Sequence, residues 1–176
     1  EMRRLSSVAS PDICVVTNIG IAHLEFFKTR EGIYREKMQM IQDMKNGGTI
    51  ILNGDDDLLS QTSPVKGVKP VFFGLDEENQ LFADHIRPLG LKGTACTIHL
   101  PDNTSFECIV PLPGIHMVSN ALAGSAAGYT LGLTPQEICA GIEGLPSMPG
   151  RSNIIETERL IILDDCYNAN PVSMKA

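Results

Sequence analysis

The feature that most constrains this chain is a pair of short apolar runs with an amphipathic helical pattern between them. The runs cover residues 13–16 and 49–52, and the helix is expected at residues 29–45. Apolar runs this short are typical of strands that are buried on both faces of a parallel sheet. Strand, helix and strand in this order predict a right-handed parallel unit, so we expect an α/β fold.

The helix expected at residues 29–45 carries a lysine, Lys37, at the centre of its apolar stripe. The stripe itself consists of Ile33, Met40, Ile41 and Met44. The lysine stem can lie along the apolar surface while its ammonium reaches water. Alternatively, burial lowers the pKa of the amine, and the neutral amine can react with carbon dioxide to form a carbamate, a ligand suited to Mg²⁺. His23 lies just beyond a strand end and could approach the same site, but the helix alone leaves both interpretations open.

Charge and composition argue against several classes of partner. The 176 residues carry a formal net charge of −7 and include no tryptophan, and no basic patch is present. We therefore expect no nucleic-acid partner. No apolar run is long enough to cross a bilayer, so we expect no membrane insertion. The five cysteines are scattered and contain no C-x-x-C pair, which indicates a reducing, cytoplasmic compartment and no structural zinc site.

The middle of the chain is expected to add a second kind of sheet. Short strand candidates lie at residues 70–73, 81–86, 95–100 and 106–110. A Pro-Asp-Asn turn separates the last two, and the strand before it alternates apolar and polar side chains. This pattern predicts an antiparallel subsheet attached to the parallel one.

Two helices and a linker are expected next. A helix rich in small residues is expected at residues 115–131, and a capping box at Thr134 starts another that ends near Ile142. Residues 144–150 hold two prolines and two glycines, which makes them the best linker candidate.

Polar residues gather after this linker and after the apolar strand expected at residues 160–163. Arg151 follows the linker directly, and D-D-C-Y-N-A-N-P at residues 164–171 follows the strand. Carboxylates and amides at the carboxyl end of a buried strand are typical of a ligand site in an α/β protein. The alternative is a solvated turn with helix-capping groups. The chain holds no glycine-rich phosphate-loop or dinucleotide-binding motif.

Four segments resemble motifs of the Mur ligases, the ATP-dependent amide ligases of peptidoglycan synthesis. They are N-I-G-I-A-H-L-E at 18–25, G-I-H-M-V-S-N-A-L-A at 114–123, P-G-R at 149–151 and D-D-C-Y-N-A-N-P at 164–171. The last, extended by Ser173 and Met174, resembles the MurF branch most specifically. The resemblance implies a Mur-type central ATP-binding domain at residues 1–149, without its phosphate-loop portion. It also implies the start of a Rossmann-like carboxy-terminal domain at residues 150–176.

For the MurF branch, the resemblance implies a ligase that joins D-alanyl-D-alanine to UDP-N-acetylmuramoyl-tripeptide through an acyl phosphate. ATP and Mg²⁺ are the implied cofactors, and we expect a cytoplasmic monomer. We expect this piece alone to be inactive, because the phosphate loop should precede Glu1. Two alternatives remain. One is another superfamily member, such as a folate polyglutamate ligase, and the segment at 164–171 argues against it. The other is a non-catalytic nucleotide-binding relative, and the presence of both His23 and Lys37 argues against that.

The resemblance also assigns roles to single residues near the proposed metal and adenine. Lys37 matches a carbamylated lysine that helps to hold a second Mg²⁺ and to orient the substrate. His23 matches the histidine of that metal site. Asn120 matches an asparagine near adenine, and His116 lies one helical turn before it. Met117 stands where relatives often carry asparagine.

The remaining assignments concern the sugar and phosphates of the nucleotide. Arg151 matches an arginine near the phosphates and ribose, and Asp165 matches an acid at the ribose or phosphates. Tyr167 and Asn168 match the motif and are assigned to the neighbourhood of the nucleotide. Cys166 replaces the usual serine of this segment.

Overall fold

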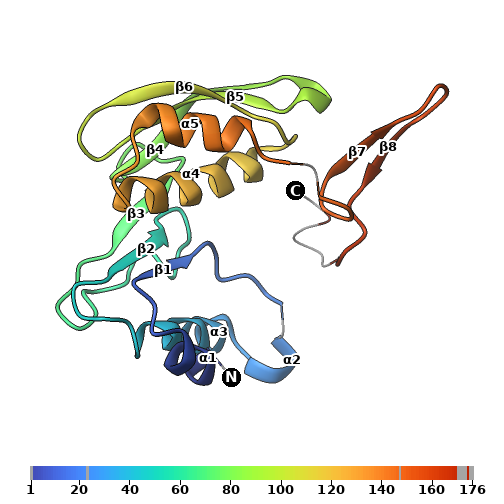
Figure 1. Ribbon diagram of the computed structural model, residues 1–176. Coiled ribbons are helices and arrows are strands. Elements are labelled where there is room, and N and C mark those ends of the chain that lie inside the picture. The colour runs from blue at the N-terminus through green and yellow to red at the C-terminus, as the bar shows by residue number, and fades with distance from the viewer. Residues whose placement is uncertain (1, 23, 147, 170–173, 175–176) are drawn as a thin grey trace.

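The computed structural model describes residues 2–22, 24–146, 148–169 and 174, and its body is a six-stranded sheet with helices on both faces (Figure 1). The sheet contains β1 (Ile13–Val16), β2 (Thr49–Asn53), β3 (Val71–Gly74), β4 (Leu81–Pro88), β5 (Thr94–His99) and β6 (Ser105–Val110), in that spatial order. The helices are α1 (Met2–Ala9), α2 (Leu24–Phe27), α3 (Arg30–Lys37), α4 (Ile115–Thr130) and α5 (Pro135–Glu143), with 3₁₀ turns η1 (Met38–Ile41) and η2 (Gly90–Lys92). Within the described part, no helix is long and apolar enough to cross a membrane.

The two faces of the sheet bury two separate cores, as the all-apolar strands predicted. On β2, Ile50 and Leu52 point into a core shared with Ile41 of η1. Ile51, between them, points to the opposite face and joins the core beneath α4 with Leu122. All five of these side chains are fully buried. The sheet is therefore a central layer, and its strand ends are the places where polar groups can gather.

The parallel part of the sheet extends further than the sequence predicted. β1, β2, β3 and β4 all run parallel, and only the β4–β5 and β5–β6 pairs are antiparallel. The prediction of an antiparallel subsheet from residue 70 onwards was therefore wrong for β3 and for the β3–β4 pair. Only Phe73 and Gly74 pair with the start of β4, at Leu81 and Phe82. Because β4 continues beyond the end of β3, the chain needs only a short return loop.

The helix expected at residues 29–45 is shorter than predicted. It begins at its N-cap Thr29, whose hydroxyl accepts from Gly32 N, and α3 ends at Lys37. The chain then tightens into η1, where the carbonyl of Met40 accepts from Ser6 Oγ at 2.7 Å and from Cys14 Sγ at 3.7 Å. Contacts to α1 and β1 thus occupy a carbonyl that a regular helix would use internally. Lys37 consequently lies at the end of a helix instead of its middle.

The strand expected at residues 160–163 is not buried as predicted. β7 (Asn153–Glu156) and β8 (Ile161–Asp164) form a two-stranded antiparallel ribbon that projects from the body of the molecule (Figure 1). Ile161 and Leu163 are 59% and 53% exposed. β8 pairs only with β7 among the described residues, so no second layer covers its apolar side chains. The assignment of residues 150–176 to a second domain stays a proposal.

The capping box predicted at the start of α5 is present, and its removal gives a first prediction. Thr134 Oγ1 accepts from Glu137 N, and the Glu137 side chain accepts from Thr134 N at 2.8 Å. We expect Thr134→Ala to lower the free energy of unfolding by about 1 kcal/mol, because a helix N–H loses its acceptor. Urea denaturation measures this loss, and the exposed Gln136→Ala serves as the matched control. Equal stability of the two variants would contradict the prediction.

Candidate active site

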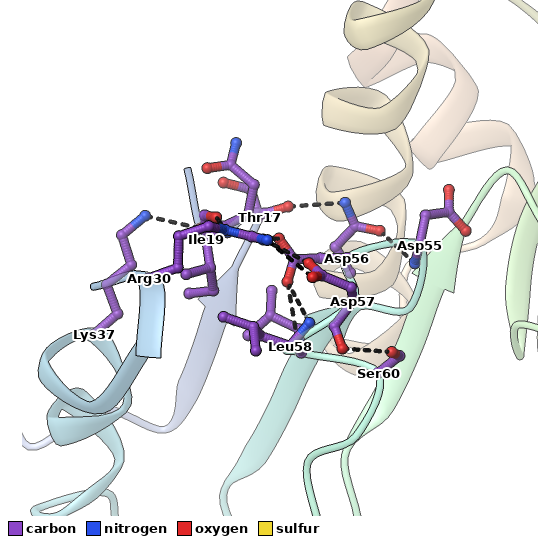
Figure 2. A network of polar contacts seen from close by, with 12 residues as sticks. Thr17, Ile19, Arg30, Lys37, Asp55, Asp56, Asp57, Leu58 and Ser60 are labelled. Atoms are coloured by element: carbon purple, nitrogen blue, oxygen red, sulfur yellow. Dashed lines mark hydrogen bonds and ion pairs between the residues drawn. The ribbon is translucent and has the colours of Figure 1, made fainter. Parts of the chain in front are cut away.

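The loop that follows β1 is held by four side chains from other parts of the chain, of which Asn53 donates to the Thr17 carbonyl at 2.9 Å (Figure 2). Lys37 Nζ donates to the carbonyl of Asn18 at 2.8 Å, and Arg30 Nε donates to the carbonyl of Ile19 at 3.0 Å. Asp56 Oδ2 accepts from Ile19 N at 2.7 Å. The Ile19 side chain is only 1% exposed and belongs to the core beneath α3. Both peptide groups around this residue are thus fixed from several directions.

Asp56 connects the carboxyl ends of β1 and β2. Its Oδ1 accepts from Leu58 N and Leu59 N, both at 3.0 Å, while Oδ2 holds the loop after β1. The side chain is 8% exposed, and Arg30 Nη2 lies 3.9 Å from Oδ2. Three N–H groups and a nearby guanidinium thus surround this one carboxylate. Sequence patterns did not single out Asp56, because its role depends on a contact with the distant loop after β1.

Arg30 is oriented by a second carboxylate, Asp57. The two side chains form a bidentate pair, with Nη1 to Oδ2 at 2.8 Å. The hydrogen bond from Arg30 holds the pKa of Asp57 below its usual range, and the same bond raises the pKa of Arg30. Asp57 is 64% exposed, so solvent screens this pair and its main effect is to fix the direction of the guanidinium.

Lys37 presents its amine at the pinned loop. The side chain is half-buried, and desolvation lowers the pKa of its amine, although the nearby Asp56 carboxylate opposes this shift. The amine therefore has a lowered pKa and donates a hydrogen bond to the Asn18 carbonyl. His23, the residue expected beside it, lies outside the described residues.

A cavity of about 710 Å³ adjoins the Lys37 amine. Its walls are mainly apolar and come from α1, α2, α3 and the loop after β1; they include Met2, Leu5, Phe26, Phe27, Ile33 and Lys37. A cavity of this size can hold a ligand of a few hundred daltons, with a few polar groups to orient it. Lys37 is one of the lining residues that carry a polar group, together with Asn18 and Glu36.

A second cluster joins the linker before β7 to the segment after β8. Asp164 Oδ2 accepts from Gly150 N at 2.8 Å, and Asp165 Oδ1 accepts from Ser152 N at 3.1 Å. Hydrogen bonds from Cys166 and from Gly150 N lower the pKa of Asp164. The two aspartates thus fasten the linker before β7 to the polar segment after β8.

Arg151 and Tyr167 meet in this second cluster. The guanidinium carbon of Arg151 lies 3.9 Å from the centroid of the Tyr167 ring, a cation–π contact. Tyr167 N also donates to Gly150 O at 3.1 Å. Asn168 is exposed, and its Oδ1 accepts from Ala169 N at 2.8 Å. Residues 170–173, which complete the predicted motif, lie outside the described residues.

The start of α4 carries the third group of predicted residues. His116 folds back over Gly114, where an added Cβ would come within 2.5 Å of the imidazole. Its Nδ1 is buried without a hydrogen-bond partner among the described residues, so it is available to a ligand. Asn120 is exposed beside Met117, with 3.6 Å from Nδ2 to the thioether sulfur. Met117 and Asn120 line a mainly apolar cavity of about 360 Å³ between α4 and α5, and His116 is not among its lining residues.

The chain resembles known proteins over nearly its whole length. The family model for the Mur ligase middle domain matches residues 1–128. The UDP-N-acetylmuramoyl-tripeptide–D-alanyl-D-alanine ligase of Bacillus subtilis is 36% identical, over 100% of this chain and 37% of the relative. The ligase of the same name from Escherichia coli is 34% identical, over 97% of this chain and 38% of its own length.

Solved structures of MurF are also similar to this chain. A crystal structure of MurF from Acinetobacter baumannii matches with a TM-score of 0.91 at 32% identity, covering 100% of this chain and 38% of that one. MurF of Thermotoga maritima in complex with ADP matches with a TM-score of 0.85 at 29% identity, covering 98% of this chain and 39% of that one. The chain therefore spans about two-fifths of the length of the proteins that it resembles.

The three acceptor bonds of Asp56 generate a prediction about stability. We expect Asp56→Asn to lower the free energy of unfolding by about 2 kcal/mol, since one of its two oxygens becomes an amide that faces buried N–H donors. Asp57→Asn, which changes an exposed carboxylate of the same turn, serves as the matched control and should cost much less. Urea denaturation of both variants measures the difference, and equal losses would argue against the special role of Asp56.

The lowered pKa of Lys37 generates a prediction about reactivity. Because the folded state favours the neutral amine, Lys37 should lose its proton at a lower pH than it does in the unfolded chain. Competitive labelling with acetic anhydride across a pH series, read by mass spectrometry, measures the titration in both states. The exposed Lys92 in the same samples is the internal control. A Lys37 titration that is identical in folded and urea-unfolded protein would contradict the assignment.

Proposed function

The chain belongs to the Mur ligase family, and from this premise we propose that the protein containing it is an ATP-dependent ligase of peptidoglycan synthesis. Its reaction would join D-alanyl-D-alanine to UDP-N-acetylmuramoyl-tripeptide. The relatives that carry this activity in their names match nearly the whole chain. The observation that carries the proposal is the half-buried amine of Lys37, held 2.8 Å from the carbonyl of Asn18 beside a large cavity.

Lys37 is proposed to act as a carbamate. A neutral amine attacks carbon dioxide, a C–N bond forms, and one proton leaves to solvent; burial favours the neutral amine that this step requires. The product is an oxygen anion, which suits a hard cation. Lys37 and His23 would then hold Mg²⁺, whose positive charge neutralises the phosphoryl and acyl-phosphate oxygens.

The pinned loop after β1 is proposed to position this group. Arg30 and Asp56 hold both sides of Ile19, so the backbone that leads to His23 starts from a fixed point. Carbamylation removes the positive charge of Lys37, which weakens its bond to the Asn18 carbonyl and frees the end of the side chain to turn toward the cavity. A fixed loop and a mobile side-chain end together orient the substrate without a large rearrangement.

We propose that ATP binds between the start of α4 and the linker before β7. Asn120 and the apolar cavity beside it suit adenine, and the unpaired Nδ1 of His116 can bond a nucleotide atom. Arg151 supplies the charge for phosphate, and the oxygen of Asp165 that does not bind Ser152 N can accept from a ribose hydroxyl. The Tyr167 ring keeps the guanidinium in place.

Asn168 is assigned to the same neighbourhood, with a role in supporting the polar segment. The proposed division into a central domain at residues 1–149 and the start of a carboxy-terminal domain at 150–176 places this nucleotide site at the junction. We further propose that the protein acts as a monomer in the cytoplasm and serves cell-wall growth, and with it cell shape and division.

The test of this function uses the full-length protein and measures phosphate released from ATP. We expect release only when Mg²⁺, UDP-N-acetylmuramoyl-tripeptide and D-alanyl-D-alanine are all present, together with the amide product detected by mass spectrometry. Release that instead requires a folate and glutamate would replace the proposal with the folate-type alternative. Absence of turnover with either substrate set would favour a non-catalytic relative.

Lys37→Ala in the full-length protein is expected to lower kcat by at least about 100-fold, since the loss of a group that supports a bound metal commonly costs 10–100-fold or more. Formate or acetate should restore part of the activity, because a short carboxylate can occupy the position of the carbamate. Lys45→Ala, which removes an exposed partner of Asp12, is the control and should be close to wild type. A fully active Lys37→Ala enzyme would disprove the carbamate role.

A further inference from the structure

The outer edge of the main sheet, formed by β6, is covered by side chains of α5. β6 is the last strand, and α5 lies along its unpaired side. Glu143 Oε1 accepts from Ile109 N at 3.1 Å, and Cys139 Sγ donates to Glu107 O at 3.5 Å. Two α5 side chains thus occupy backbone groups that a neighbouring strand would otherwise pair.

Cys139 and Glu143 also meet a thiol from β6 itself. The sulfur atoms of Cys108 and Cys139 and a carboxylate oxygen of Glu143 all lie within 4.8 Å of one another. Cys96 is the cross-strand partner of Cys108, and both side chains are buried in the core beneath α4 and α5. Three of the five cysteines therefore converge on one corner of the molecule.

We propose that Cys108, Cys139 and Glu143 form a binding site for a thiophilic divalent ion of the zinc type. Two thiolates and a carboxylate are ligands that zinc accepts, with a tetrahedral arrangement at about 2.3 Å from sulfur and about 2.0 Å from oxygen. Ligand atoms around one such ion lie just under about 4 Å apart, so the observed cluster needs only a small contraction. A water molecule would complete the coordination.

The surroundings of the cluster allow an ion to enter and be oriented. Cys139 is half-buried and Glu143 is exposed, so one side of the cluster opens to solvent. The bond from Ile109 N to Oε1 of Glu143 fixes this carboxylate beside the two thiols. The pKa of both thiols is raised by burial, so binding must displace a proton from each sulfur.

The cysteine spacing along the sequence predicted no zinc site, because no C-x-x-C pair is present. The cluster arises only when α5 packs along β6, a long-range contact that spacing cannot reveal. Its residues are different from those of the Lys37 network and of the proposed nucleotide site. The metal site and the ligase function can therefore succeed or fail independently.

Cadmium is the direct probe, because cadmium–thiolate bonds absorb in the near ultraviolet. Titration of the reduced chain should saturate at one ion per chain, with release of two protons, and zinc should displace the signal. Cys139→Ser is expected to weaken binding at least about tenfold and to reduce the thiolate absorption. Glu143→Gln, which keeps an oxygen for Ile109 N, should keep the absorption and weaken binding.

Cys166→Ser is the matched control, since it removes an exposed thiol from the segment after β8 and should leave the titration unchanged. Zinc should also raise the Tm of the wild-type chain and fail to raise that of Cys139→Ser. If Cys139→Ser does not fold, the exposed Glu143→Gln variant carries the test. Absence of thiolate absorption in the folded, reduced wild type, or binding unaffected by both variants, would overturn the proposal.

Discussion

One carboxylate, that of Asp56, connects the ends of the first two strands of the sheet. It accepts from Ile19 N after β1 and from Leu58 N and Leu59 N after β2. Parallel strands place their carboxyl ends at one edge, but this arrangement alone leaves the two following loops free. The aspartate joins them, and the buried Ile19 side chain adds an apolar anchor. The loop that carries the proposed metal histidine therefore starts from a fixed position.

The position of Lys37 follows from the same packing. α3 ends at Lys37, where η1 begins, and the Met40 carbonyl at the end of this turn accepts from Ser6 and Cys14. The lysine consequently sits at a helix end, near enough to the loop for its amine to reach the Asn18 carbonyl at 2.8 Å. Burial among apolar neighbours lowers the pKa of the amine. The adjacent cavity leaves space for the proposed carbamate. The same few residues thus take part in the packing around α3 and in the proposed chemistry of Lys37.

Local patterns predicted the parts of the fold that depend on local interactions. The apolar runs of β1 and β2, the small-residue helix α4 and the capping box at Thr134 all appear where expected. The β3–β4 pairing was missed because parallel and antiparallel partners give similar short apolar patterns. The end of α3 was missed because it depends on bonds from distant residues.

The residues of the candidate site also divide into those that local sequence patterns reveal and those that depend on long-range contacts. Lys37, Arg151 and Asp165 could be singled out, because an amine on an apolar stripe and acids after a strand are visible in the sequence. Arg30 and Asp56 could not, since their function depends on tertiary contacts with Ile19, which is 11 residues from Arg30 and 37 residues from Asp56. The exposed apolar face of β8 is another long-range effect, because a strand pattern does not show whether a covering layer is present.

The claim that the loop after β1 is pinned can be tested by hydrogen exchange of the Ile19 amide, measured by NMR on the unmodified chain. The Ile19 amide donates to the carboxylate of Asp56, whose side chain is 8% exposed. Ile19 itself is only 1% exposed. If the loop is pinned, this amide exchanges as slowly as the central β2 amides, such as that of Leu52. Exchange at the rate of an unprotected amide, while β2 stays protected, would show that the loop is free and would contradict the account.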